Sequence, residues 1–132
     1  CYSYLGRVGG EQYLSLQKKV CLKSGTTFHG MGLTVGLINE QERPDRDQYI
    51  EVNYQNIPEE WHSQFEKVSD KEFFHSHPYD YASAMHYPLT ARGIYKDAFE
   101  VRQPLVDAKK IGKMKQLSVL DIEKINSLYK ME

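Results

Sequence analysis

The sequence predicts an α+β fold in a single domain. Its 132 residues are enough to bury a core. Hydrophobic residues make up 40% and charged residues 27%, which is the balance of an ordinary globular chain. Short stretches that alternate apolar and polar residues predict strands, and stretches with capping residues or helical spacing predict helices. Both kinds of element occur along the chain.

The first third of the chain predicts one short strand followed by one helix. Tyr13 to Leu16 alternates weakly after the turn at Gly9 and Gly10, which favours a strand. The sequence SGTT then supplies capping residues before Phe28, so a helix is expected to begin there. It should end near Gly36, because glycine adopts the left-handed conformation that closes many helices.

The middle of the chain predicts a turn, a strand and a second helix. The sequence RPDRD at 43–47 indicates a polar turn, and Ile50, Val52 and Tyr54 alternate as in a strand. Pro58 suits the first turn of a helix. That helix would carry an apolar face at i, i+4 and i+7, made by Trp61, Phe65 and Val68. Residues 69–108 are expected to be mostly irregular.

The stretch LSVLDIEKINSLYK at 117–130 predicts a further helix. Ser118 is a natural N-cap, and Asp121 stands three residues later, where the acid of a capping box belongs. The expected apolar face consists of Ile122, Ile125 and Tyr129.

Charge and hydropathy exclude two classes of partner. The formal net charge is -1 and the basic residues form no stripe, so nucleic acid is not expected to bind. No apolar run has the length of a membrane span. The chain opens on Cys1 rather than Met, which suggests a processed or truncated piece.

Two cysteines, Cys1 and Cys21, leave two alternatives open. A disulfide between them would close a loop of about 20 residues and contribute roughly 3 kcal/mol in the chain-entropy model. The other alternative is a pair of reduced thiols in a cytosolic protein. We favour the disulfide and, with it, a secreted or extracellular protein.

The stretch FHGMGLTVGLINEQERPDRD at 28–47 has the outline of a zinc-binding helix and its following turn. The pattern HExxHxxGxxH places two ligands on one helical face, a glutamate as general base, and a third ligand after a glycine turn. His29 and Gly36 fit this pattern. Gly30 stands at the base position, and Leu33 and Asn39 stand at the second and third ligand positions.

Several motifs together resemble the astacin family of zinc metallopeptidases, a metzincin family. They are CYSYLGRVGG, SGTTFHGMG, NEQERPDRDQYI, PYDYASAMHYP and IGKMKQLSVLDIEKINSLYK, and the resemblance runs from Cys1 to Lys130. It implies the later part of a two-lobe, zincin-like domain that is incomplete at its N-terminus. Residues 1–25 would end the upper lobe, 26–39 would form a degenerate zinc helix, and 40–132 would form the lower lobe.

The resemblance also implies roles for individual residues. His29 matches the first zinc ligand, Met85 the methionine of the Met-turn beneath the metal, and Tyr87 the tyrosine that can ligate zinc and assist the tetrahedral intermediate. Cys1 and Cys21 match a family disulfide. Glu40 matches the glutamate that helps to anchor the mature N-terminus in the family, and we do not expect it to have that role if the chain is an N-terminally incomplete piece.

The residues at the metal positions predict no bound cofactor, although zinc is the cofactor of the family. Leucine has no donor atom, and an asparagine carbonyl is a weak zinc ligand beside imidazole. Gly30 cannot take a proton from water, a task worth roughly 10²–10⁴-fold in rate. We expect Leu33 to let the metal cavity collapse into core, and His29 to be hydrogen-bonded or partly exposed.

Other histidines do not rebuild the site on this interpretation. His75 and His77 form an H-x-H pair in a stretch that is better explained as a polar surface loop. His62 is isolated, and the family does not use the histidine equivalent to His86 as a ligand.

Three hypotheses follow. The first is an inactive astacin-like domain that binds a protein or peptide partner. The second is an active zinc endopeptidase with an atypical site. The third is a fragment that needs another chain to complete its fold.

Overall fold

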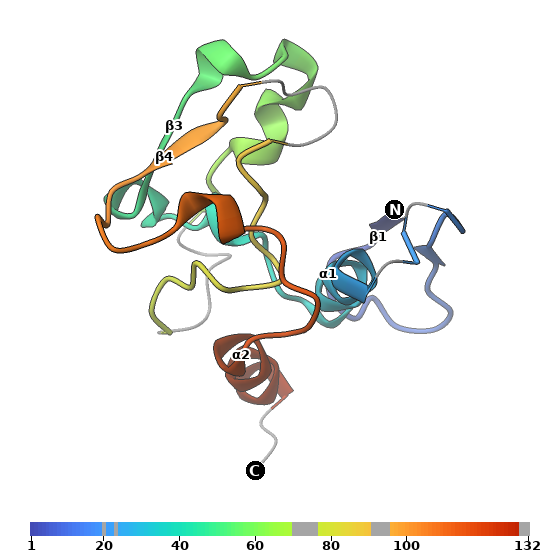
Figure 1. Cartoon of the computed structure of the whole chain (residues 1–132). Helices are drawn as coiled ribbons and strands as arrows, with labels where there is room; N and C mark the ends of the chain where they lie inside the picture. The colour runs from blue at the N-terminus through green and yellow to red at the C-terminus, as the bar shows by residue number, and fades with distance from the viewer. Residues whose placement is uncertain (20, 23, 70–76, 91–95, 130–132) are drawn as a thin grey trace.

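The computed structural model of the chain describes residues 1–19, 21–22, 24–69, 77–90 and 96–129. Within these residues, two small antiparallel sheets and two α-helices are joined by short 3₁₀ helices, which confirms the α+β prediction. Figure 1 shows α1 beside β1 on one side of the molecule and the β3–β4 pair on the other. The second helix, α2, lies at the C-terminal end.

The N-terminal segment forms a two-stranded ribbon that packs on α1. Strand β1 (Tyr2–Ser3) pairs with β2 (Leu14–Ser15), so the predicted strand is present and gains a partner that the pattern did not reveal. The Ser3 hydroxyl lies 2.7 Å from that of Thr34, and the Gly6 amide donates to the Leu33 carbonyl at 2.8 Å. These two bonds attach the ribbon to the helix. The predicted disulfide between Cys1 and Cys21 is also present.

Helix α1 (Ser24–Val35) ends where the sequence predicts but begins four residues before Phe28. Gly36 has a φ of 104°. Its amide donates to the Leu33 carbonyl at 3.0 Å, and the Leu37 amide donates to the Gly32 carbonyl at 2.9 Å. These two bonds satisfy the last carbonyls in a Schellman motif. The glycine turn therefore redirects the chain toward Asn39.

The β3–β4 pair carries the main hydrophobic core. Strand β3 (Ile50–Val52) pairs with β4 (Phe99–Val101), with Val52 opposite Phe99. The prediction of a strand at Ile50 and Val52 is confirmed, but Tyr54 lies in a 3₁₀ helix, η3 (Tyr54–Asn56). Strand β4 lies in a stretch expected to be irregular, so that expectation was wrong there. The fully or nearly fully buried core residues are Ile50, Ile57, Phe65, Ala98, Phe99 and Ile111.

The helix expected after Pro58 is a 3₁₀ helix, η4 (Glu59–Phe65), rather than an α-helix. A 3₁₀ helix turns every three residues, so side chains four apart do not share a face. Phe65 is fully buried while Trp61 is 37% exposed, and Val68 lies past the end of the element. The predicted apolar face is therefore wrong, although Phe65 does enter the core.

Helix α2 (Val119–Tyr129) begins with the predicted capping box. The Ser118 hydroxyl accepts from the Asp121 amide at 3.0 Å, and the Asp121 carboxylate accepts from the Ser118 amide at 3.1 Å. The predicted apolar face is wrong, because Ile122 and Tyr129 are 48% and 43% exposed. The face that packs inward instead carries the buried side chains of Asp121 and Lys124.

Of these two, Lys124 finds its partner in the segment after α1. In η1 (Glu40–Glu42), the Glu40 carboxylate meets Lys124 Nζ at 2.8 Å and Arg43 Nη1 at 3.0 Å, with side chains no more than 3% exposed. The Asp80 amide also donates to Glu40 at 2.9 Å. A buried carboxylate with this many partners is well compensated. The predicted turn at 43–47 is present, but two of its side chains are buried, since Arg43 and Arg46 are 2% and 4% exposed, while Asp47 is exposed.

Among the described residues, no helix combines the length and the hydropathy needed to cross a bilayer.

Candidate functional site

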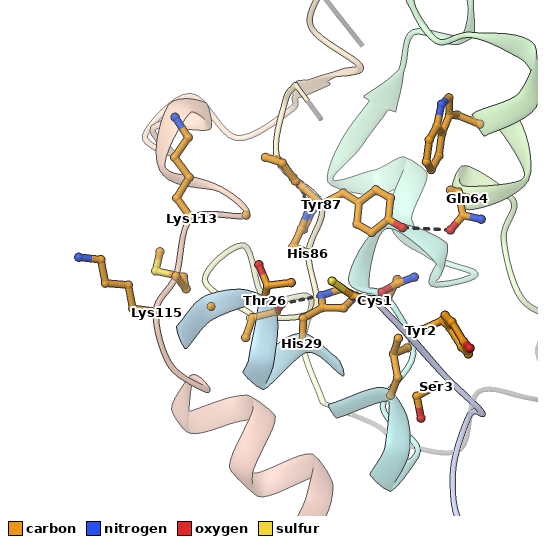
Figure 2. Close-up of a pocket in the computed structure, with 18 residues that line it drawn as sticks. Cys1, Tyr2, Ser3, Thr26, His29, Gln64, His86, Tyr87, Lys113 and Lys115 are labelled. Atoms are coloured by element: carbon orange, nitrogen blue, oxygen red, sulfur yellow. Dashed lines mark hydrogen bonds between the residues drawn. The ribbon is translucent and has the colours of Figure 1, made fainter. Parts of the chain in front are cut away.

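A cavity of about 760 Å³ opens beside α1, and four of the predicted site residues, His29, Leu33, Asn39 and Tyr87, line it. Figure 2 shows His29 and Tyr87 facing the hollow, with Cys1, Tyr2 and Ser3 on one side and Lys113 and Lys115 on the other. The lining residues that matter for its chemistry are His29, Leu33, Asn39, Trp61, Gln64 and Tyr87. The expectation that the cavity collapses around Leu33 was wrong: Leu33 is only half-buried and lines the opening.

His29 is hydrogen-bonded, as expected. Its Nδ1 lies 2.9 Å from the carbonyl oxygen of Ala84. A carbonyl can only accept, so Nδ1 carries a proton and Nε2 of the neutral ring carries a lone pair. Burial lowers the pKa of His29, and the hydrogen bond to Ala84 only partly offsets that effect.

Met85 packs against α1. It is 1% exposed, and its sulfur occupies the space where any side chain at Gly32 would stand. The turn is held by Asp121, whose carboxylate accepts from the Ser83 hydroxyl at 2.5 Å and from the Ala84 amide at 2.9 Å. The cap of α2 therefore positions the carbonyl that orients His29.

Tyr87 lies opposite His29, with 6.0 Å between the ring centroids. Its hydroxyl donates to Gln64 Oε1 at 3.0 Å, and its amide donates to Gln41 Oε1, also at 3.0 Å. Burial raises the pKa of Tyr87, so the hydroxyl keeps its proton. Sequence reasoning missed both glutamines. Gln41 lies within the family motif NEQERPDRD, whereas Gln64 carries no signal in the sequence.

Asn39 is 7% exposed, and its Oδ1 is a buried acceptor without a hydrogen bond among the described residues. The neighbouring acid Glu42 also escaped the sequence reasoning. Burial raises the pKa of Glu42 to about 7, against the opposing effect of a hydrogen bond to the Asn39 side chain. Asn39 also favours the protonated form of His29. One amide therefore lies between an imidazole and a carboxyl group.

Gly30 has no side chain that could act in catalysis. A Cβ built on it would lie 3.3 Å from Cδ1 of Leu14 and 3.8 Å from Cδ2 of Leu16, so the leucines of the N-terminal ribbon fill the adjoining space. A side chain at position 30 would have to displace Leu14.

The other histidines are committed elsewhere or lie outside the described residues. His86 is buried, with Nε2 2.7 Å from the Tyr79 hydroxyl and Nδ1 2.8 Å from the Tyr87 carbonyl. Burial lowers the pKa of His86 to about 4. His62 bonds to the Ile57 carbonyl at 2.8 Å. The interpretation of the H-x-H pair as part of a polar surface loop stays a prediction, because its first member, His75, lies outside the described residues.

The residues present do not fit a zinc ion. A tetrahedral site needs three protein donors such as histidine, cysteine or carboxylate. Here His29 offers one imidazole, Leu33 offers no donor atom, and Asn39 offers a neutral amide oxygen. Within the described ranges, no cluster of three His, Cys, Asp or Glu side chains could hold a metal.

A glycine-ended helix, a buried methionine turn beneath it and a tyrosine across the cavity together define the class of zincin-like metallopeptidase domains. The chain belongs to the astacin family of peptidases, whose family model matches residues 1–130.

Relatives and a solved structure agree with this assignment. The chain is 40% identical over 134 residues to zinc metalloproteinase nas-4 of Caenorhabditis elegans and 37% identical over 131 residues to the low choriolytic enzyme of Oryzias latipes. Both matches cover 98% of this chain, which spans 41% and 47% of the two relatives.

The structure of high choriolytic enzyme 1, a hatching enzyme zinc-protease of Oryzias latipes, superposes with a TM-score of 0.88 at 37% identity. The match covers all of this chain and 65% of that one. The predicted metzincin fold is therefore confirmed.

Proposed function

We propose that this chain is a catalytically inactive astacin-family domain, a pseudopeptidase whose cleft binds a peptide segment of a partner in an extracellular setting. The disulfide between Cys1 and Cys21 supports that setting, because such bonds persist in oxidising compartments. The cavity beside α1 supports the binding role, since it stays open although its metal donors are gone. Family membership supplies the cleft, and the substitutions remove its chemistry.

One observation carries the proposal: the side chains at the floor provide a single imidazole where a zinc site needs three donors. Zinc in a complete structural site contributes on the order of 10–16 kcal/mol, and that affinity is distributed over all its ligands. Gly30 in addition removes the general base. Water would therefore be neither bound by a metal nor deprotonated at this site.

The experiment compares the wild-type chain with a restored variant. After dialysis against metal-free buffer, we expect wild-type protein to hold far less than one zinc per chain and to leave a fluorogenic peptide uncut. The variant Leu33→His/Asn39→His should take up one zinc per chain, because it recovers the three-imidazole set. Adding Gly30→Glu should bring chelator-sensitive hydrolysis if Leu14 yields space. Stoichiometric zinc in the wild type, with hydrolysis that a chelator stops, would establish the atypical-endopeptidase alternative instead.

A second candidate is a domain completed by another polypeptide segment. The observation that favours it is the exposed apolar surface of the N-terminal ribbon: Tyr2 and Tyr13 are each 70% exposed, and Tyr4 is 64% exposed. Large exposed apolar patches commonly mark interaction surfaces. Sedimentation and thermal unfolding of the purified chain separate the two candidates. A monomer with one cooperative transition favours the self-sufficient binding module, whereas aggregation or absent cooperativity favours the incomplete one.

A further inference from the structure

The floor of the cavity presents acceptor atoms. His29 donates its Nδ1 proton to the Ala84 carbonyl at 2.9 Å, which leaves the lone pair of Nε2. The Tyr87 hydroxyl gives its only proton to Gln64 at 3.0 Å, which leaves its oxygen as an acceptor. Asn39 adds Oδ1. The three side chains, from α1, the loop before η1 and the segment after Met85, line the same cavity.

Asn39 shows that a donor is missing from this set. The residue is 7% exposed, and its Oδ1 is buried without a partner among the described residues. Nearly all buried polar atoms in folded proteins are hydrogen-bonded, and the exceptions call for a ligand, an ion or a water. Its neighbours are His29, whose free ring nitrogen is itself an acceptor, and Glu42, whose ionised carboxylate is favoured by a hydrogen bond from the Asn39 side chain.

Two acidic side chains lie near the floor. Burial is the largest effect on His29 and lowers its pKa, and the buried Asp121 carboxylate opposes that shift as the smallest of the causes. Glu42 disfavours the ionised form of Tyr87, whose pKa is raised mainly by burial. Lys113 and Lys115 line the far rim, but Figure 2 shows their side chains extending away from His29.

Part of the lining is apolar. Leu33, Trp61 and Met114 line the cavity, together with polar side chains such as Ser3 and Gln64. Such a surface suits the methylene stem of a long amphipathic side chain whose charged end reaches polar partners. The substitution that removes a zinc ligand, leucine at position 33, is the same one that provides an apolar contact for such a stem.

We propose that the floor formed by His29, Asn39 and Tyr87 binds a primary ammonium group, carried by a lysine side chain or an amino terminus of the partner peptide. An ammonium ion has three donors and no acceptor, which matches three acceptors without a proton to give. The proposal rests on the proposed function, because it specifies what the inactive cleft recognises. Zinc demands anionic or imidazole donors, whereas an ammonium group accepts neutral oxygen and nitrogen partners.

The test is a titration followed by NMR of the His29 ring nitrogens. The probes are n-butylammonium chloride and three short glycine peptides. One peptide is capped at both ends and has a central lysine, the second has norleucine in its place, and the third has a free amino terminus. We expect the lysine peptide to bind at least about tenfold more tightly than the norleucine peptide and to shift the His29 Nε2 resonance. Comparing the lysine peptide with the amino-terminal peptide identifies which amine is preferred.

Two substitutions with opposite expected effects on the preference for lysine test the role of Asn39. Asn39→Leu should reduce the preference for lysine over norleucine by about tenfold, and Asn39→Asp should increase it by a similar factor because it adds a negative charge. Lys113→Met/Lys115→Met is the control and should leave the His29 shift in place.

Equal binding of the lysine and norleucine peptides would overturn the ammonium site while leaving the inactive binding domain standing. If the Asn39 variants weaken the binding of the lysine and norleucine peptides equally, Asn39 has only a structural role, and the ammonium site is likewise overturned. Failure of the proposed function is detected by a separate measurement, as stoichiometric zinc and chelator-sensitive hydrolysis in the wild-type chain. If no probe binds at all, the ammonium site is rejected.

Discussion

Single side chains at the cleft floor change its chemistry while the backbone around them stays that of the family. The loss of zinc donors could be predicted from the sequence, because Leu33 and Asn39 occupy fixed positions in a known spacing. That the cavity stays open could not be predicted. It depends on Met85 packing against Gly32 and on Asp121 holding the Met-turn, contacts between residues far apart in the chain. These contacts keep the floor rigid without a metal.

Glu42 makes the stability of the chain dependent on pH. Burial raises its pKa from 4.5 to about 7, so folding favours the protonated carboxyl. The free energy of unfolding therefore has its full value below the unfolded-state pKa and falls as the pH rises through about 7. Glu42→Gln removes the ionised form, so at about pH 8 we expect it to stabilise the chain by about 1–2 kcal/mol after allowance for solvent screening.

Urea denaturation at two pH values measures this effect. At about pH 4 the two proteins should differ by less than about 0.5 kcal/mol, because Glu42 is then protonated in both states. The exposed Glu123→Gln serves as the matched control and should show little change at either pH. A Glu42→Gln effect of the same size at both pH values would contradict the assignment.

At the scale of elements, the end of α1 and the cap of α2, which depend on neighbouring residues, were predicted well. Features that depend on residues far apart in the chain were not. The end of α1 at Gly36 and the capping box of α2 depend on neighbouring residues, and both are confirmed. Strand β4 depends on pairing with β3, some fifty residues earlier, and its own sequence is too short to reveal it. The inward face of α2 was misassigned because Lys124 looks like a surface residue until its partner Glu40 is known.

Lys124 is expected to hold α2 against the segment after α1. Lys124→Met removes one partner of the buried Glu40 carboxylate and should lower the free energy of unfolding by about 3 kcal/mol. Lys67→Met, which breaks an exposed pair with Asp47, should lower it by less than about 1 kcal/mol. Chemical denaturation measures both. Adding Glu40→Gln to Lys124→Met should recover part of the lost free energy of unfolding. If the two lysine substitutions lower it equally, the buried pair contributes no more to stability than the exposed one.

At the scale of the molecule, the cleft lies where the N-terminal ribbon, α1 and the Met-turn meet. Cys1, Tyr2 and Ser3 of the ribbon line it together with Ala84 and Tyr87 of the turn region. The disulfide ties the ribbon to the residues just before α1. The shape of the cleft therefore depends in part on a segment that the disulfide and the bonds of Ser3 to Thr34 and of Gly6 to Leu33 hold beside α1.

Removing the disulfide is expected to loosen that segment. Cys1→Ser/Cys21→Ser should lower the free energy of unfolding by roughly 3 kcal/mol in the chain-entropy model, as measured by urea denaturation. Reduced wild-type protein is the control and should show a loss of similar size. A loss below about 1 kcal/mol would mean that the ribbon is held by its contacts with α1 rather than by the covalent link.

The pairing of Lys124 with Glu40 also bears on how the chain is made. The two residues are 84 positions apart, so a ribosome working at 5–20 residues per second adds the lysine roughly 4–17 s after the glutamate. Until then the Glu40 carboxylate can pair only with residues that are closer to it in the sequence. Helix α2 is not yet present to support the floor of the cleft. In a nascent chain the cleft would thus be complete only after Lys124 has been synthesised, and chaperones that shield unfinished polypeptides would have that interval to act.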